Sequence, residues 1–222
     1  MKRVFIIAAA LIAALPMAYA NTYSFTSVVT AGTTETTAGN YPITVWGYYN
    51  SSANALSVSN GIISLVGTAS NLSYDSTYGL GVGKSSSEIT LQSFVVFDFA
   101  DPGTGKLGGP ELNGATSAII TIDNANSGWT IYGGNSAPGT GGITNLTSLA
   151  SGTKAQNGTA STQYAQTVSL AGFSYLAVIA AGSCELNILK IDTNPVPEPG
   201  TFVMAGLALI GLGMALRKAR KA

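Results

Sequence analysis

The chain of 222 residues contains no histidine. Histidine is the usual general base of Ser-His-Asp and Cys-His catalytic sites and the commonest zinc ligand, so its absence excludes most familiar hydrolase mechanisms. Carboxylate pairs of the kind that hydrolyse glycosidic bonds stay conceivable, but nothing in the spacing of the Asp and Glu residues selects a pair. We therefore expect a protein that is not an enzyme.

Cysteine and charged residues are also scarce. Cys184 is the only cysteine, so no intramolecular disulfide can form, and we interpret it as a buried apolar side chain in preference to an intermolecular bridge. Charged residues make up 9% of the chain, and six of its ten Lys and Arg residues lie near the two ends. Residues 21–196 are left with a net charge of −5, which argues against nucleic acid as a partner.

The N-terminus has the three parts of a secretory signal peptide. Lys2 and Arg3 form a basic region, an apolar run covers 4–15, and Ala18 and Ala20 form an A-x-A cleavage site. Residues 1–20 are therefore predicted to be a helical signal peptide. Cleavage after Ala20 would make Asn21 the mature N-terminus.

Three short signals follow one another at the C-terminus. A Pro-Glu-Pro-Gly motif falls within 196–200, an apolar run predicts a membrane helix over 201–216, and a basic end covers 217–222. The apolar run is shorter than the roughly 20 residues of a plain anchor. The positive-inside rule places the basic end on the cytoplasmic side of the inner membrane. The motif residues are Pro197, Glu198, Pro199 and Gly200, and the basic residues are Arg217, Lys218, Arg220 and Lys221.

This tail resembles the PEP-CTERM sorting signal of Gram-negative bacteria, in which a Pro-Glu-Pro motif precedes a membrane helix and a basic end. The resemblance implies recognition at Pro197, Glu198 and Pro199 by an exosortase, a membrane-embedded cysteine transpeptidase that passes its substrate to the cell surface or extracellular matrix. Similar tails are also labelled as the C-terminal domain of ice-binding proteins, a label that says nothing of what the rest of the chain binds. An ordinary single-pass anchor is the alternative.

Residues 21–194 are predicted to form one ectodomain, and 195–222 the sorting tail. The ectodomain is rich in Gly, Ser, Thr and Asn, and short runs of β-branched and aromatic residues alternate with polar turns, which predicts an all-β sandwich. Nearly every position of 94–99 is apolar, so this strand is expected to be central. The predicted strands are 23–29, 43–49, 61–66, 88–99, 118–122, 129–132, 167–170, 175–180 and 184–191.

A glycine-alternating segment at 78–83 precedes Glu88, Ile89 and the strand 94–99. This order resembles a pattern found in many exosortase substrates, and the resemblance implies a β-sandwich of jelly-roll type without an established enzymatic role. A phosphate-binding loop is excluded because a strand, not a helix, is predicted to follow the glycines. We expect the glycines to serve a bend or bulge.

Two ligand classes stay open for the ectodomain. Ca²⁺ binds oxygen ligands and is common outside cells, although no known calcium-binding repeat is present. Its candidate ligands are Asp75, Glu88, Asp98 and Asp101. A glycan could stack on aromatic side chains in two strands, with Trp46, Tyr48, Trp129 and Tyr132 as candidates; the alternative is that these rings pack the core.

The sequence thus predicts an exported, non-enzymatic protein of the cell surface or extracellular matrix. It is expected to be processed near Pro197 to Pro199 and to associate with extracellular polysaccharide or biofilm. The alternative is an adhesion module that binds carbohydrate or calcium. No cofactor is expected apart from Ca²⁺.

Overall fold

The computed structural model describes residues 21–25, 33–35, 43–75, 79–82, 88–99, 115–123, 128–153, 164–170, 172–182 and 186–195. Throughout these ranges the regular structure is β-strand, and no helix occurs in them. The strands are β1 (Asn21–Ser24), β2 (Thr33–Glu35), β3 (Ile43–Tyr49), β4 (Leu56–Ser59), β5 (Ile62–Val66), β6 (Thr68–Ser70), β7 (Leu72–Asp75), β8 (Gly79–Val82), β9 (Ser93–Asp98), β10 (Ala115–Asp123), β11 (Gly128–Gly134), β12 (Gly142–Thr153), β13 (Tyr164–Ser169), β14 (Tyr175–Ala181) and β15 (Asn187–Pro195).

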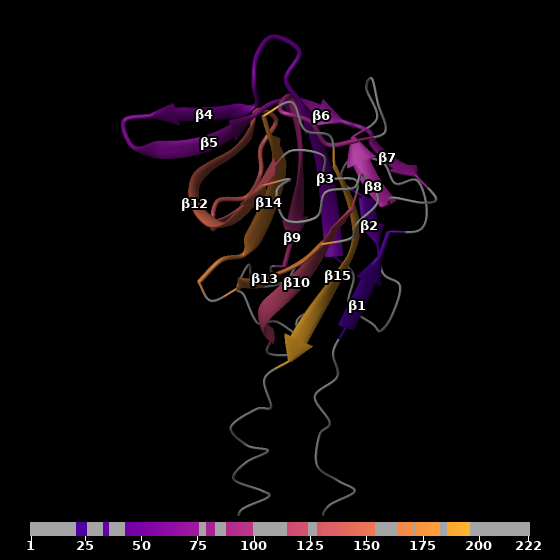
Figure 1. Cartoon of the computed structure of the whole chain (residues 1–222). Coiled ribbons are helices and arrows are strands. Elements are labelled where there is room, and N and C mark those ends of the chain that lie inside the picture. Colours follow the sequence, from indigo (N-terminus) through magenta and orange to yellow (C-terminus); the bar gives the residue numbers. More distant parts are fainter. Residues whose placement is uncertain are drawn as a thin grey trace, which may run out of the picture.

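The strands form two antiparallel sheets that pack face to face (Figure 1). The six-stranded sheet has the order β13-β10-β15-β8-β7, and the nine-stranded sheet has the order β2-β3-β9-β14-β11-β12-β5-β4, with β6 beside β3. One edge of β15 pairs with β10, while its other edge is shared by β8 and β1. The predicted all-β sandwich is confirmed.

The strands from β8 onward follow a jelly-roll path. Four nested antiparallel pairs, β8·β15, β9·β14, β10·β13 and β11·β12, describe one long hairpin whose tip lies between β11 and β12. Alternate pairs lie in different sheets, so the hairpin is folded across the sandwich, as in two linked Greek keys. The helices predicted over 1–20 and 201–216 fall outside the described residues.

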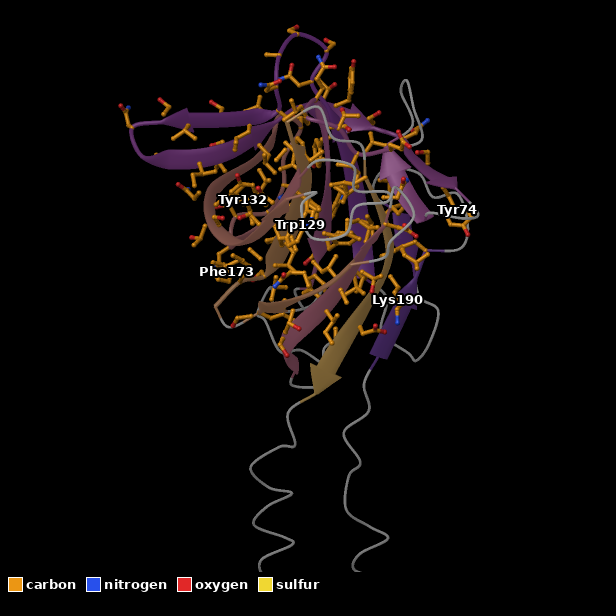
Figure 2. All side chains as sticks on the ribbon, in the orientation of Figure 1. Tyr74, Trp129, Tyr132, Phe173 and Lys190 are labelled. Carbon is orange, nitrogen blue, oxygen red and sulfur yellow. The ribbon has the colours of Figure 1, made fainter. Side chains whose placement is uncertain are left out.

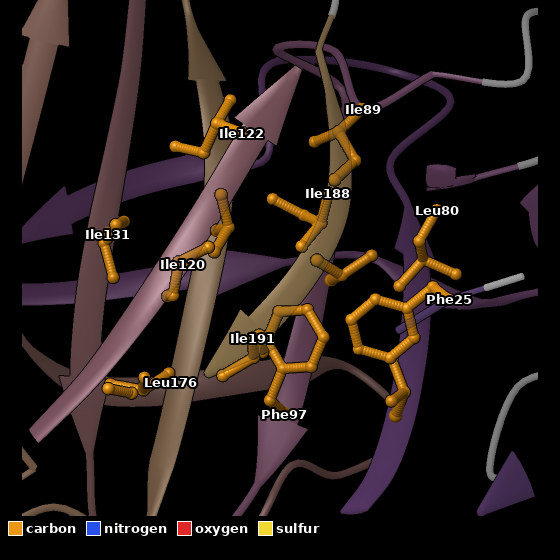
Figure 3. Packing of buried hydrophobic residues seen from close by; sticks show 14 of the residues in the cluster. Phe25, Leu80, Ile89, Phe97, Ile120, Ile122, Ile131, Leu176, Ile188 and Ile191 are labelled. Carbon is orange, nitrogen blue, oxygen red and sulfur yellow. The ribbon is translucent and has the colours of Figure 1, made fainter. Parts of the chain in front are cut away.

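The main core lies between the two sheets and is built by alternation along the strands. In β9, which lies between β3 and β14, Val95 and Phe97 point into this core, and Phe99 continues the same face. The rings of Phe97 and Phe25 lie with their centroids 5.6 Å apart, and isoleucines of the six-stranded sheet pack against them (Figure 3). The central position predicted for 94–99 is confirmed.

A second apolar cluster lies on the other face of the nine-stranded sheet. Strand β12 pairs with β11 through its C-terminal half and with β5 through its N-terminal half. It bends between these halves, where the register shifts and Asn145 adopts a left-handed φ of 58° (Figure 1). The resulting outer cluster comprises Tyr48, Ala55, Leu65, Phe94, Val96, Tyr132, Ile143, Leu146, Ala177 and Ile179.

Candidate functional site

The outer face of the nine-stranded sheet brings together side chains that are far apart in the sequence. Asp98 at the end of β9 is paired with Thr44 of β3 on one side and with Tyr175 of β14 on the other. Residues paired directly across antiparallel strands place their side chains on the same face, with Cβ atoms about 4.5–5.5 Å apart. Thr44, Asp98 and Tyr175 therefore form a polar row, and all three are partly exposed.

Trp46 extends this row by one step. It follows Thr44 by two residues on β3 and pairs with Val96, so it lies diagonal to Asp98 on the same face. Its ring packs against the outer cluster but is only partly buried. We call Thr44, Trp46, Asp98 and Tyr175 the outer-face site.

Burial and a neighbouring charge both favour the protonated form of the Tyr175 hydroxyl. Desolvation raises the pKa of Tyr175 above the usual value of 10.0, and the negative charge of the nearby Asp98 raises it further. A phenol with the usual pKa of 10.0 is already protonated at neutral pH, and the raised pKa of Tyr175 keeps it so, which lets the hydroxyl donate a hydrogen bond. Asp98 adds a carboxylate that can accept one.

These groups suit binding better than catalysis. A partly exposed aromatic ring offers an apolar surface on which a sugar ring can stack, and neighbouring polar side chains can hydrogen-bond to its hydroxyl groups. Hydrolysis of a glycosidic bond needs two carboxylates. Asp98 is the one acidic residue in β3, β9, β11 and β14, so these four strands supply no such pair.

The four predicted glycan residues do not lie on one exposed surface. Trp46, Tyr48 and Tyr132 belong to the outer face, whereas Trp129 points into the core between the sheets (Figure 2). Trp129 and Tyr48 are each 3% exposed and Tyr132 is 6% exposed, and the ring of Tyr48 stacks on that of Phe94 at 4.9 Å. Burial leaves Trp46 as the one candidate with a partly exposed ring.

The predicted calcium ligands lie in different parts of the fold. Asp75 ends β7 in the six-stranded sheet, Asp98 ends β9 in the nine-stranded sheet, and Glu88 precedes β9. Asp101 falls outside the described residues. Within the ranges that the structure covers, no three Asp, Glu, Cys or His residues gather into a metal-binding group.

The first and last described strands lie side by side. β1 pairs antiparallel with β15, with Asn21 opposite Thr193, so Asn21 and Pro195 lie at the same end of the sandwich. The signal cleavage residues Ala18 and Ala20, the Pro-Glu-Pro-Gly motif, the basic end and Cys184 are outside the described residues. In the part of the chain that is described, no helix is long and apolar enough to span a membrane.

Residues 195–221 match the family model of the PEP-CTERM protein-sorting motif. The chain carries a PEP-CTERM sorting signal. Such a signal implies an exported protein whose precursor is held in the membrane by its C-terminus, and which is processed by an exosortase, a membrane enzyme. The sorting signal begins at 195, and the pairing of β1 with β15 puts Asn21 at the same end of the described ectodomain as Pro195.

The ectodomain is similar to two solved structures at low identity. One is from a study of glycan recognition in the Ruminococcus flavefaciens cellulosome, with 12% identity, a TM-score of 0.31, and coverage of 82% of this chain and 99% of the other. The second is the K3 adhesin domain of Lys-gingipain from Porphyromonas gingivalis, with 13% identity and a TM-score of 0.36. This match covers 77% of this chain and 95% of the other. A search of curated proteins gave no match.

Two members of the outer-face site were not predicted from the sequence of this PEP-CTERM protein. Thr44 and Tyr175 lie in strands that were expected, but neither carries a motif. Tyr175 is joined to Asp98 only by the pairing of β9 with β14, two strands separated by four others in the sequence. Alternation along each strand assigns faces, and the jelly-roll order then brings these faces together.

Proposed function

We propose that this PEP-CTERM protein is a non-enzymatic component of the cell surface or extracellular matrix, and that its ectodomain binds extracellular polysaccharide at the outer-face site. The observation that carries the binding role is the partly exposed Trp46 ring beside the Asp98 carboxylate and the protonated Tyr175 hydroxyl. A sugar ring would stack on Trp46. Its hydroxyl groups would exchange hydrogen bonds with Asp98, Tyr175 and Thr44.

The route to the surface follows from the two ends of the chain. Residues 1–20 direct export and are removed after Ala20, and the tail then holds the folded ectodomain at the inner membrane of a Gram-negative cell. The pairing of β1 with β15 is compatible with this route, because it puts Asn21 and Pro195 at the same end of the folded ectodomain. Exosortase cleavage near Pro197, Glu198 and Pro199 then releases the ectodomain for deposition.

The binding role is tested by replacing Trp46 with alanine. Loss of an aromatic contact worth about 0.5–1.5 kcal/mol should weaken retention on polysaccharide of the producing organism by up to roughly tenfold. Affinity electrophoresis of the full chain, in gels with and without that polysaccharide, measures the change.

Tyr74→Ala is the matched control. Tyr74 is also a partly buried aromatic residue, but it lies on β7 of the six-stranded sheet, away from the outer-face site (Figure 2). We expect Tyr74→Ala to migrate like the wild type. Equal retention of the wild type and Trp46→Ala would exclude the outer-face site as the polysaccharide site, and an equal loss in both variants would point to a general effect on folding.

A further inference from the structure

The hairpin of β4 and β5 carries a group of exposed apolar side chains. Leu56 is 39% exposed, Val58 65%, Ile62 47% and Val66 42%, and these are the large exposed hydrophobic residues of the described ranges. The surrounding strands do not counter this with charge, because no Lys, Arg, Asp or Glu occurs in 43–74 or in 128–153. The register of the hairpin puts Leu56 and Val58 on one face and Ile62 and Val66 on the other. Apolar side chains exposed on both faces of one uncharged hairpin point to an interaction site.

Strand β4 is also an open edge. It ends the nine-stranded sheet and pairs only with β5 in the described structure. Proteins usually protect such an edge with charged residues, proline or a bulge. β4 has none of these, since its sequence is Leu-Ser-Val-Ser and its register with β5 is regular.

The turn at the tip of the hairpin determines which backbone groups face the open edge. Asn60 and Gly61 have φ values of 51° and 77°, as in a two-residue type I′ turn, which makes Ser59 and Ile62 a hydrogen-bonded pair. Hydrogen-bonded and non-hydrogen-bonded pairs alternate along the hairpin. Ala55 and Val66 form another hydrogen-bonded pair, in which the amide of Val66 donates to the carbonyl of Ala55 at 2.8 Å. Leu56 and Val58 fall between these pairs, so their N–H and C=O groups point away from β5.

We propose that β4 pairs antiparallel with β4 of a second copy of this chain, about a two-fold axis that passes through Ser57. Leu56 then lies opposite Val58 of the second copy, and Val58 lies opposite its Leu56. Both pairs join residues with outward-facing backbone groups, so they form about four hydrogen bonds. The four side chains share one face, on which Ile63 and Leu65 already lie beside them, so the apolar row continues across the axis.

The outward-facing N–H and C=O groups of Leu56 and Val58 and their apolar side chains match those of a second β4 strand, so we take a second copy of this chain as the partner. An interface that maps onto itself under a two-fold rotation is the commonest kind in homo-oligomers. Two four-residue strands bury little surface, so the pair is weak in dilute solution. Many copies held at one membrane or in one matrix raise the effective concentration. This self-association does not depend on polysaccharide binding.

The experiment is disulfide trapping of the full chain in the producing cells. In a Cys184→Ser background, Ser57→Cys puts two thiols across the axis in a pair that is not hydrogen-bonded, with Cα atoms about 4.5 Å apart, inside the range of about 4.4–6.8 Å for disulfides. The matched control, Ser59→Cys, is also at an exposed position, but its two copies lie roughly 13 Å apart. After mild oxidation, Ser57→Cys should give a reductant-sensitive band of twice the mass, and Ser59→Cys should not.

With the cysteine variants alone, three results would overturn the proposal. These are no dimer band with Ser57→Cys, equal bands with both variants, or a cross-link to a protein of another mass. Adding Val58→Lys to Ser57→Cys places like charges about the axis and should abolish the band, while its exposed position leaves the core intact. A dimer band that persists would contradict pairing through β4. If Cys184→Ser lowers the amount of exported chain, Cys184→Ala serves as the background.

Discussion

Replacing Phe97 by alanine is expected to lower the free energy of unfolding by about 3–5 kcal/mol. Phe97 is fully buried, and its ring lies in the middle of the core between the sheets, 5.6 Å from the ring of Phe25 (Figure 3). Its strand is held on both sides by β3 and β14, so the backbone cannot close on the space that the ring leaves. The lower free energy of unfolding therefore has two sources: the ring's apolar burial is lost, and a cavity stays unfilled.

Urea unfolding of the purified chain, followed by tryptophan fluorescence, measures this loss. Trp129 lies in the same core as Phe97, so its fluorescence reports directly when this core is exposed to water. Val58→Ala is the control, because Val58 is 65% exposed and its truncation should change stability by less than about 0.5 kcal/mol. If the two variants unfolded at the same urea concentration, the packing between the sheets would not be the main source of stability.

Substitution of Gly79 by alanine is expected to destabilise the chain for two separate reasons. Gly79 begins β8 with a φ of 100°, a conformation that costs other residues about 1–3 kcal/mol. A Cβ atom there would also overlap the carbonyl oxygen of Ile188 and lie 2.8 Å from the Cα atom of Leu189, both on β15. Overlap with backbone that cannot move aside adds roughly 1–3 kcal/mol.

Gly172→Ala separates these two contributions. Gly172 has a similar φ of 84°, but nothing lies within 4 Å of the position of its Cβ atom. Urea unfolding should therefore show a clearly greater loss for Gly79→Ala than for Gly172→Ala. Equal losses would mean that β8 and β15 do not approach each other as closely as described.

Sequence patterns predicted nine strands that alternate or are largely apolar. They missed the bent strand β12 and five strands of only three or four residues, namely β2, β4, β6, β7 and β8. The strand expected over 43–49 matches β3, and 94–99 lies at the centre of its sheet. β12 was missed because its two halves pair with different strands, β11 and β5. Buried and exposed residues therefore do not alternate regularly along it, and the sequence shows no strand pattern. Gly79 and Gly81, which were expected to serve a bend or bulge, lie in strand β8.

The outer-face site was predictable only in part. Trp46 and Asp98 were candidates, but for different ligands, and the pairing of β3 with β9 is what puts them on one face. Trp129 was grouped with Tyr132 because both are aromatic residues of one strand. They are three residues apart, so alternation sends Trp129 into the core and Tyr132 to the outer face.

We propose that this β-sandwich reaches the cell surface or matrix through its PEP-CTERM tail. The most direct test compares the intact mass and location of the cell-produced chain with those of a variant in which Pro197, Glu198 and Pro199 are all replaced by alanine. We expect the wild type to begin at Asn21, to lack the tail and to be found at the surface, while the variant keeps its tail and stays in the inner membrane. Recovery of both forms in the membrane with intact tails would contradict the account.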